Sequence, residues 1–364
     1  MKNQTITAIF VLVASAQFVF ILGQISLTER AQLDFAVSLL QNVAESDKSS
    51  VLSPFSVSTS LFIAYLAADG ETKQQLQSVL GKDASISEFR LHFAKQLAYI
   101  ARAGSRNYTL TVANRLYVRE GLSVKESFQR VLSFYYSDLL HKFSFGQRNR
   151  LVQQINNWIS SKTNNKVRNI ITTRSITEDT RMLLMNAIHF KGTWTVQFID
   201  FATKQKQFHI SENEMKLVLM MTKSDTVPYY EDDAVKVIKL PYIGDEVEMV
   251  IILPRRRFGL SDVLGNLSGE KLLKYVNEAT NRSVSAYSVL YLSLTFTSSI
   301  LVVTLNSLYI RQRRLYKKLK SLFAVNFFDA AKFDFRIVAA SLSSFSTNDG
   351  IATAMAIMEG KNDN

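Results

Sequence analysis

Histidines, carboxylates and cysteines most often carry catalysis or hold metals, and this chain arranges few of them for either task. It has no cysteine, so thiolate nucleophiles, thiolate metal sites and disulfide bonds are all excluded. Its histidines lie far apart, without a second ligand at a metal-binding spacing; they are His92, His141, His189 and His209. Asp232 and Asp233 are adjacent, which favours a surface turn over a catalytic pair. No glycine-rich phosphate loop and no G-x-S-x-G motif is present. The sequence therefore predicts a binding protein without metal or cofactor, not an enzyme.

The composition is that of a globular protein with a substantial core. Of 364 residues, 47 % are hydrophobic and 20 % are charged, which excludes a largely disordered chain. The net charge is +12, and half of this excess comes from one short basic run. That run consists of Arg311, Arg313, Arg314, Lys317, Lys318 and Lys320. A solvated basic face explains such a run better than polyanion binding, so no nucleic-acid partner is expected.

The first residues have the pattern of a secretory signal peptide. Lys2 precedes the apolar stretch 9–22, which has small residues near its end. We predict a signal peptide at residues 1–23, cleaved after about residue 16 or 23, and one domain at residues 24–364. An uncleaved anchor is the alternative. The mature protein would be secreted, extracellular and glycosylated. Glycosylation sequons begin at Asn107, Asn266 and Asn281.

Helical and strand periodicities are interspersed along the chain. Residues 26–43, 54–70 and 151–163 have the length and apolar spacing of helices, whereas residues 110–118 and 246–254 alternate as strands do. Neither a regular β-α-β alternation nor an internal repeat is present. This pattern predicts an α+β fold.

One apolar run does not fit this pattern. Residues 286–310 contain no charge in 25 positions, and the basic run follows them directly. A translated intron or other gene-model error is the favoured explanation, which makes about residues 284–313 an atypical insert. A membrane span with a basic flank and a divergent pair of strands are the alternatives. A membrane partner is expected only if residues 286–310 are a true membrane span.

Several stretches of the chain resemble the serpin family, and they occur in the family's order. They are "LSPFSVSTSLFIAYLAADGETKQQL" (52–76), "INNWISSKTNNKVRNII" (155–171), "LMNAIHFKGTWTVQF" (184–198), "VIKLPYIGDEVEMVIILP" (237–254) and "LKSLFAVNFFDAAKFDF" (319–335). The resemblance implies a serpin-like fold with three β-sheets and eight to nine helices, incomplete at the C-terminus. The resemblance also implies structural roles for six residues in two regions of the main sheet, the shutter beneath it and the breach at its end. These residues are Ser53, Ser56, Asn186, Lys191, Gly192 and Trp194.

Residues 348–364 resemble part of the reactive loop of that family. The hinge of this loop would be Gly350, Ile351, Ala352, Thr353, Ala354, Met355 and Ala356. Alternate alanines would share one face of a strand, and small side chains suit a strand that slides into a sheet. The resemblance implies a suicide substrate, in which protease cleavage lets the loop insert into the main sheet. A polar tail that resembles a hinge by chance is the alternative.

The chain departs from the family pattern near its end. Family spacing places the cut bond after Asn364, and the strands that follow it in the family are missing. The strand before the hinge is also expected to be missing. "RIVAASLSSFST" (336–347) stands in its place and lacks the family's histidine near Ser53, Ser56 and Asn186.

The predicted function is a secreted, monomeric serpin-type inhibitor of serine endopeptidases, with cysteine endopeptidases as the alternative target class. The alternative function is a non-inhibitory serpin-like binding protein, or an inactive truncated isoform without a scissile bond. Weak glycosaminoglycan binding is a further prediction. It rests on Arg90, Lys95, Arg102 and Arg106, which do not form a tight stripe.

Overall fold

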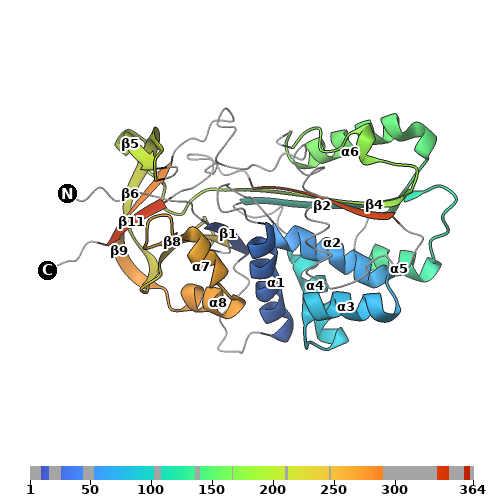
Figure 1. Ribbon diagram of the computed structural model, residues 1–364, viewed down its shortest axis with the longest axis horizontal. Coiled ribbons are helices and arrows are strands. Elements are labelled where there is room, and N and C mark those ends of the chain that lie inside the picture. The colour runs from blue at the N-terminus through green and yellow to red at the C-terminus, as the bar shows by residue number, and fades with distance from the viewer. Residues whose placement is uncertain are drawn as a thin grey trace.

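The strands of this chain form two β-sheets with helices packed around them (Figure 1). The computed structural model describes residues 10–15, 26–43, 53–101, 108–135, 140–165, 167–209, 212–245, 247–289, 334–343 and 356–360. Eight α-helices lie in these ranges, interspersed with strands of both sheets. The predicted α+β architecture is therefore confirmed.

The smaller sheet has four strands. They are β2 (Tyr108–Arg119), β3 (Leu140–Phe143), β4 (Thr180–Gly192) and β10 (Asp334–Ser343), in the order β10-β4-β2-β3. β2 runs antiparallel to β4, whereas β10 runs parallel to it. Because β10 includes most of the stretch 336–347, the prediction that no strand precedes the hinge was wrong.

The larger sheet has seven strands. They are β1 (Phe10–Ser15), β5 (Lys204–His209), β6 (Met215–Glu231), β7 (Val235–Pro241), β8 (Val247–Pro254), β9 (Thr280–Val289) and β11 (Ala356–Gly360). Their order is β1-β8-β7-β6-β9-β11, and β5 also pairs with β6. β6 pairs with β5 and β9 along most of its length and with β7 only at its end. The long strand β6 thus joins β5, β7 and β9 into a single hydrogen-bonded sheet.

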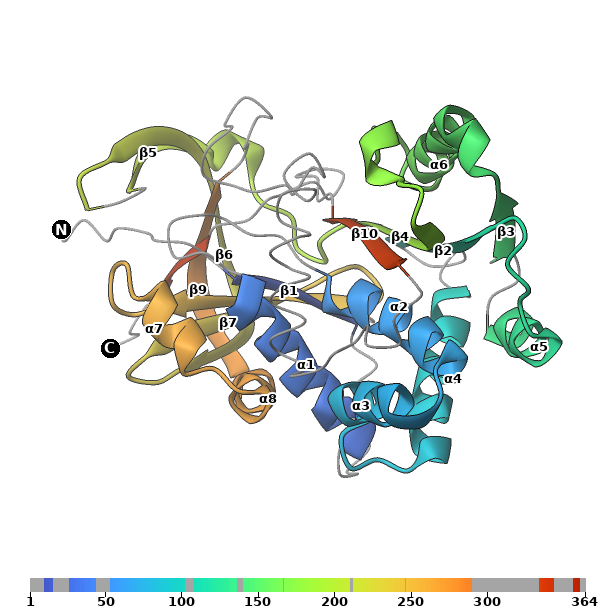
Figure 2. The ribbon, with the colours of Figure 1, turned by 45° about the vertical axis from the view of Figure 1, so that its right-hand side comes forward.

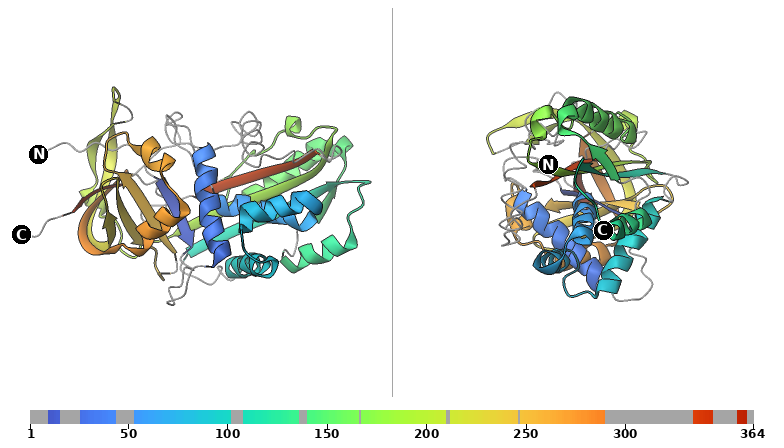
Figure 3. Two further views of the ribbon diagram at one scale, coloured as in Figure 1. Left: turned by 60° about the horizontal axis from the view of Figure 1, so that its bottom comes forward. Right: turned by 90° about the vertical axis from the view of Figure 1, so that its right-hand side faces the viewer.

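Helices pack against both sheets, and the four-stranded sheet is covered on both of its faces (Figures 1 and 3). They are α1 (Leu27–Val43), α2 (Pro54–Ala67), α3 (Gly70–Gly81), α4 (Ile86–Ala101), α5 (Glu126–Tyr135), α6 (Arg148–Lys162), α7 (Leu260–Gly265) and α8 (Gly269–Asn277). Short 3-10 turns occur at Phe145–Gln147, Thr173–Ser175 and Asp200–Ala202. α6 lies on one face of this sheet and α2 on the other, while α7 and α8 flank the larger sheet.

Apolar spacing explains which faces the helices bury. Leu151, Ile155 and Ile159 of α6 recur every fourth residue, and all three are buried in one cluster with Leu183 and Met185 of β4. Since β4 is covered on both faces, its residues 182–188 are apolar on both sides, with Asn186 as the exception.

An aromatic cluster holds α2 to α4. The ring of Phe62 stacks on that of Phe93, with centroids 4.3 Å apart, and meets Phe89 edge-on at 5.4 Å. Such pairs add directional packing to the area that the rings bury.

The unusual apolar segments give a mixed outcome. Part of the predicted signal peptide forms β1. The first residues of the apolar run, 286–289, lie in β9, and residues 290–310 lie outside the described ranges. In those ranges no helix combines the length and the apolar character needed to cross a bilayer.

Candidate functional site

Two neighbouring parallel strands, β4 and β10, define the candidate site (Figure 2). Their register runs from Phe335 opposite Met182 to Ser343 opposite Phe190. α2 packs against both strands. The chain after Ser343 leads toward the predicted hinge. A segment that turns back there and enters between the two strands would be antiparallel to both, so each of its edges would find a ladder partner.

Asn186 is a buried polar residue at the centre of this sheet. Its side chain is fully shielded from solvent, and its Nδ2 group donates a hydrogen bond to Oδ1 of Asn114 on β2. Its own Oδ1 has no hydrogen-bond partner in the part of the chain that the structure describes. Ala339 is the β10 residue level with Asn186. That the polar cluster around Ser53, Ser56 and Asn186 is incomplete without a histidine stays a prediction.

Trp194 joins the end of β4 to the larger sheet. Its ring is 2 % exposed and stacks on Tyr242, with centroids 4.3 Å apart and planes within 17°. The backbone is bonded on both sides of the stack. The Thr195 amide donates to the Pro241 carbonyl at 3.0 Å, and the Ile243 amide donates to the Thr193 carbonyl at 2.8 Å. Burial raises the pKa of Tyr242 well above its ordinary value.

Lys223 lies beside this junction, and its side chain is only 3 % exposed. Its Nζ donates to the carbonyl of Val196 at 3.0 Å and lies 5.4 Å from the ring centroid of Phe198. Asp225 is its ion-pair partner at 3.5 Å. Burial lowers the pKa of Lys223, and the Asp225 carboxylate opposes that shift. This buried cation therefore anchors the segment that follows Trp194. The residues Thr193 to Phe198, Lys223, Asp225 and Tyr242 are called the Trp194 junction below.

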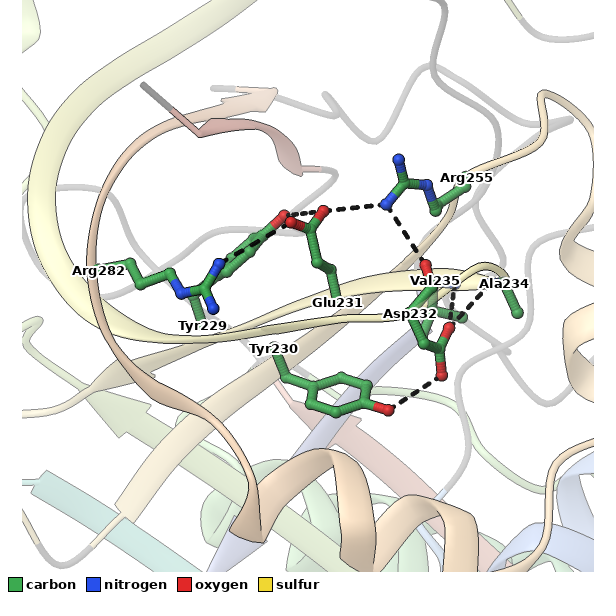
Figure 4. A network of polar contacts seen from close by, with 8 residues as sticks. All are labelled: Tyr229, Tyr230, Glu231, Asp232, Ala234, Val235, Arg255 and Arg282. Carbon is green, nitrogen blue, oxygen red and sulfur yellow. Dashed lines mark hydrogen bonds and ion pairs between the residues drawn. The ribbon is translucent and has the colours of Figure 1, made fainter. Parts of the chain in front are cut away.

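A polar network around Glu231 ties the end of β6 to its neighbours (Figure 4). The Glu231 carboxylate accepts a hydrogen bond from the Tyr229 hydroxyl at 2.8 Å and from Arg255 Nη1 at 3.0 Å. Arg282 of β9 lies 3.9 Å from the other carboxylate oxygen. Burial, and then the bond to Glu231, raise the pKa of Tyr229. This carboxylate is occupied by structural contacts.

The adjacent acidic pair is a turn, as the sequence predicts. Oδ1 of Asp232 accepts hydrogen bonds from the amides of Ala234 and Val235 at 2.8 and 2.9 Å, and its other oxygen accepts from the Tyr230 hydroxyl at 3.2 Å (Figure 4). Asp232 thus closes the β6–β7 hairpin as an Asx-type cap. Asp233 is exposed beside it. Nothing in this arrangement suits acid–base catalysis.

The predicted shutter and breach residues take up places along α2 and β4. The Ser53 carbonyl accepts the first amide bond of α2, from Val57 at 3.2 Å, and Ser56 lies in the first turn. Lys191 and Gly192 end β4, opposite Thr109 and Tyr108 of β2. Asn186 lies in the same strand, and Trp194 follows its end by two residues.

The predicted hinge lies mostly outside the described residues. Only Ala356 is described, at the start of β11, which pairs antiparallel with β9 from Ala356 opposite Ser288 to Gly360 opposite Val284. Residues 356–360 of the predicted loop thus form a strand of the larger sheet and not of the sheet that the loop is expected to enter.

Two of the three sequons are exposed. Asn266 ends α7, where its Nδ2 donates to the Asp262 carbonyl at 2.8 Å, and Asn281 is an exposed residue of β9. Asn107 lies outside the described ranges. Glycosylation at each of them stays a prediction.

The basic residues of the glycosaminoglycan prediction are only partly described. Arg90 and Lys95 are exposed on α4, while Arg102 and Arg106, like the basic run 311–320, lie outside the described ranges. Among the residues that are described, no group of three or more acidic or histidine side chains could hold a metal ion.

The family model "Serpin (serine protease inhibitor)" matches residues 30–299. The chain belongs to the serpin family, whose members are commonly protease inhibitors and not catalysts. The resemblance predicted from the five sequence stretches is confirmed.

Among individual relatives, the chain is similar to Serpin B6 of Pongo abelii, with 31 % identity over 247 residues, which is 66 % of this chain and 65 % of that protein. The match thus spans less than two thirds of this curated relative. The structure resembles ovalbumin from the emu, Dromaius novaehollandiae, with a TM-score of 0.67, 26 % identity and coverage of 71 % and 72 % of the two chains. It also shares its fold with native protease nexin-1 with heparin, with a TM-score of 0.75, 20 % identity and coverage of 92 % and 90 %.

Sequence reasoning missed two residues of the Trp194 junction. Tyr242 and Lys223 are separated from Trp194 by long stretches of chain. Tyr242 lies in the stretch 237–254 but was not singled out there, and Lys223 stands in no motif. The only signal for the burial of Lys223 was that a lysine follows the mostly apolar residues 217–222. This signal is weak because lysine side chains commonly reach solvent.

Proposed function

We propose that this chain is a secreted, monomeric inhibitor of serine endopeptidases that acts as a suicide substrate. The observation that carries the proposal is the parallel pairing of β4 with β10, the strand that leads to the predicted hinge. After cleavage, the freed segment would turn back at the end of β10 and enter between these two strands. The new strand would gain backbone hydrogen bonds on both edges.

The Trp194 junction is where such a segment would begin to enter. β4 and β10 run in the same direction, so the end of β10 at Ser343 is level with Phe190, four residues before Trp194. The stacked rings and the buried Lys223 would keep this end of β4 fixed to the larger sheet while the two strands separate.

The test is covalent capture of a protease. The full chain is incubated with a panel of serine endopeptidases and two cysteine endopeptidases, and the products are resolved by denaturing electrophoresis and mass spectrometry. Inhibition by insertion gives an SDS-resistant complex whose mass is the sum of both partners minus whatever peptide lies beyond the bond that is cut. Clean cleavage by every protease, or no reaction with any, would exclude inhibition for this chain.

The alternative function is a non-inhibitory serpin-like binding protein. The unpaired Oδ1 of Asn186 favours it, because an incomplete polar cluster weakens the sheet through which insertion must occur. A synthetic peptide of residues 350–361 separates the two functions. If the sheet can open between β4 and β10, the peptide raises the melting temperature. If it cannot, the melting temperature stays constant at saturating peptide.

Glycosaminoglycan binding is a separate, weaker proposal. It is supported by the exposed Arg90 and Lys95 on α4, and a fold relative was solved with heparin. Heparin-affinity chromatography tests it with the double variant Arg90→Ser, Lys95→Ser. A specific site requires the variant to elute at clearly lower salt than the double variant Lys204→Ser, Lys216→Ser, which removes two lysines from β5 and β6.

A further inference from the structure

Two arginine side chains from different elements lie against one aromatic ring, that of Phe145. Arg119 ends β2, and its guanidinium carbon lies 5.6 Å from the centroid of this ring. Arg148 begins α6, and its guanidinium carbon lies 4.9 Å from the same centroid. Each cation gains from the aromatic face, but two cations held at one ring repel each other.

No carboxylate of the described chain neutralises this pair. Nη1 of Arg119 donates a hydrogen bond to the backbone carbonyl of Glu178, and neither Arg119 nor Arg148 forms an ion pair with any residue in the described ranges. Glu120 and Glu178 have exposed side chains at the same end of the sheet, yet neither carboxylate pairs with these two arginines. Both positive charges are therefore available to an anionic group of another molecule.

The start of α6 adds to the positive charge. Arg148 and Arg150 lie in its first turn, which contains no acidic residue, and the cap residue Gln147 makes no side-chain cap bond. The helix dipole disfavours cations at this end. Two arginines in this turn, beside a third from β2, oppose the local rule, and sequences break such rules most often at functional surfaces.

The pairing of arginine with aromatic rings continues along α6, which packs against β2 (Figure 2). Arg115 precedes Arg119 by four residues on β2, so the two side chains share one face of the strand about 13 Å apart. The guanidinium carbon of Arg115 lies 4.7 Å from the ring centroid of Trp158. Trp158 and Phe145 are both half-buried against the core cluster beneath α6, which fixes the two rings. Arginine and aromatic side chains dominate the energetic centres of protein–protein interfaces.

We propose that these five residues form a docking site for an acidic segment of a partner protein. They are Arg115, Arg119, Phe145, Arg148 and Trp158, called the α6 arginine face below. Planar guanidinium groups bind carboxylates through two parallel hydrogen bonds. An extended segment holds residues i and i+4 on one side, about 13 Å apart, which matches the spacing of Arg115 and Arg119 along β2. The exposed Glu120 and Glu178 would repel a long polyanion, so a segment with few charges fits this face better than a sulfated glycan.

The first experiment measures binding of a model segment to the full chain by fluorescence anisotropy at low ionic strength. The probe is a labelled nine-residue peptide with glutamate at its third and seventh positions and uncharged residues elsewhere, and the matched peptide has glutamine at both positions. The test variant is Arg119→Gln, Arg148→Gln. The control variant, Arg168→Gln, Arg174→Gln, removes the same charge from exposed positions in the connection that follows α6.

The wild type is expected to bind the glutamate peptide about ten-fold more tightly than the glutamine peptide, because charged hydrogen bonds are the strong ones. The test variant should lose this difference, and the control variant should keep it. Equal losses in the two double variants would overturn the proposal, because net charge alone would then explain binding. Equal affinity of the wild type for both peptides would overturn it too.

The single variant Arg148→Gln keeps the test valid if the double variant does not fold, since Arg148 is exposed and its removal leaves the core intact. We expect its melting temperature to equal or exceed that of the wild type, because one of two repelling charges is gone. Its affinity for the glutamate peptide should fall about five-fold. Unchanged affinity would show that the arginine pair does not hold the peptide.

The second experiment distinguishes the kinds of anion. Unlabelled glutamate peptide, sodium sulfate and a heparin hexasaccharide compete for the wild type against the labelled peptide. We expect the unlabelled peptide to displace the probe at the lowest concentration. If sulfate does so instead, the face binds a single free oxyanion, and if the hexasaccharide does so, it binds a sulfated glycan. Either result would mean that no protein segment is the ligand.

Discussion

Lys223 is the residue whose environment differs most from what its type prefers. A lysine ammonium group in water is strongly hydrated, yet here it is almost entirely shielded from solvent and is compensated by the Val196 carbonyl, the Asp225 carboxylate and an aromatic face. Burying an ammonium group among such partners costs desolvation energy that the contacts only partly return.

The lowered pKa of Lys223 makes stability depend on pH. Below the ordinary lysine pKa of 10.5, the unfolded chain holds this proton more tightly than the folded chain does. The free energy of unfolding therefore rises with pH between the lowered pKa and 10.5. Urea denaturation at several pH values up to 10 is expected to show this rise in the wild type and to show less of it in Lys223→Met.

The control for this prediction is Lys216→Met, which removes a lysine from an exposed position of the same strand. The difference between the two variants in how the free energy of unfolding changes with pH gives the contribution of the buried lysine at position 223. Two identical profiles would mean that Lys223 is not shielded in solution.

At the residue scale, the sequence was informative where a residue stands in a local motif. Trp194 and Asn186 lie in one conspicuous stretch, and both are buried, while their shutter and breach roles stay predictions. The burial of Lys223 and the stacking of Tyr242 on Trp194 could not be predicted, although Tyr242 lies in the stretch 237–254, because both depend on which distant segments meet. That information is absent from local spacing.

Two helices meet at Gly269, and this contact gives the prediction at the scale of elements. A Cβ built on Gly269 would lie 2.5 Å from Asp34 Oδ1 and 2.8 Å from the Asp34 amide nitrogen on α1. Since part of that contact is backbone, α1 and α8 would have to move apart. Gly269→Ala is expected to lower the free energy of unfolding by about 1–3 kcal/mol, measured by urea denaturation.

Gly265→Ala is the matched control for this contact. A Cβ on Gly265, at the end of α7, meets no atom within 4 Å and needs no unusual backbone angle. It should change the free energy of unfolding by at most about 1 kcal/mol, in the stabilising direction. Equal losses in both variants would show that the α1–α8 contact is looser than described.

Elements with a strong period were predictable, and elements that depend on partners were not. Helix α6 and strand β8 lie where spacing alone places them. β10 was not expected as a strand, and β1 was expected only as a leader. Both are short segments that become strands because β4 and β8 offer them a ladder partner, a condition that no local window of sequence contains.

For the whole molecule, the Trp194 junction couples the two sheets. Trp194→Ala removes the stacked ring from a site that is closed to solvent, and it is expected to cost about 3–5 kcal/mol of unfolding free energy. Trp194→Phe keeps a ring against Tyr242 and should lose less. Thermal unfolding followed by calorimetry is the measurement. Equal losses in the two variants would show that Tyr242 does not need the stack to hold the sheets together.

The predicted hinge determines whether the molecule as a whole can change its fold. A strand that enters between β4 and β10 must pass its side chains between two packed layers, with α6 on one face and α2 on the other. Ala354→Arg adds a long charged side chain to that strand, and burying its charge costs several kcal/mol. We expect the variant to be cleaved as an ordinary substrate and to form no SDS-resistant complex, while the intact variant melts at the temperature of the wild type. Ala354→Ser, which stays small, should keep the complex. If Ala354→Arg still captures protease with undiminished stoichiometry, this segment does not enter the sheet.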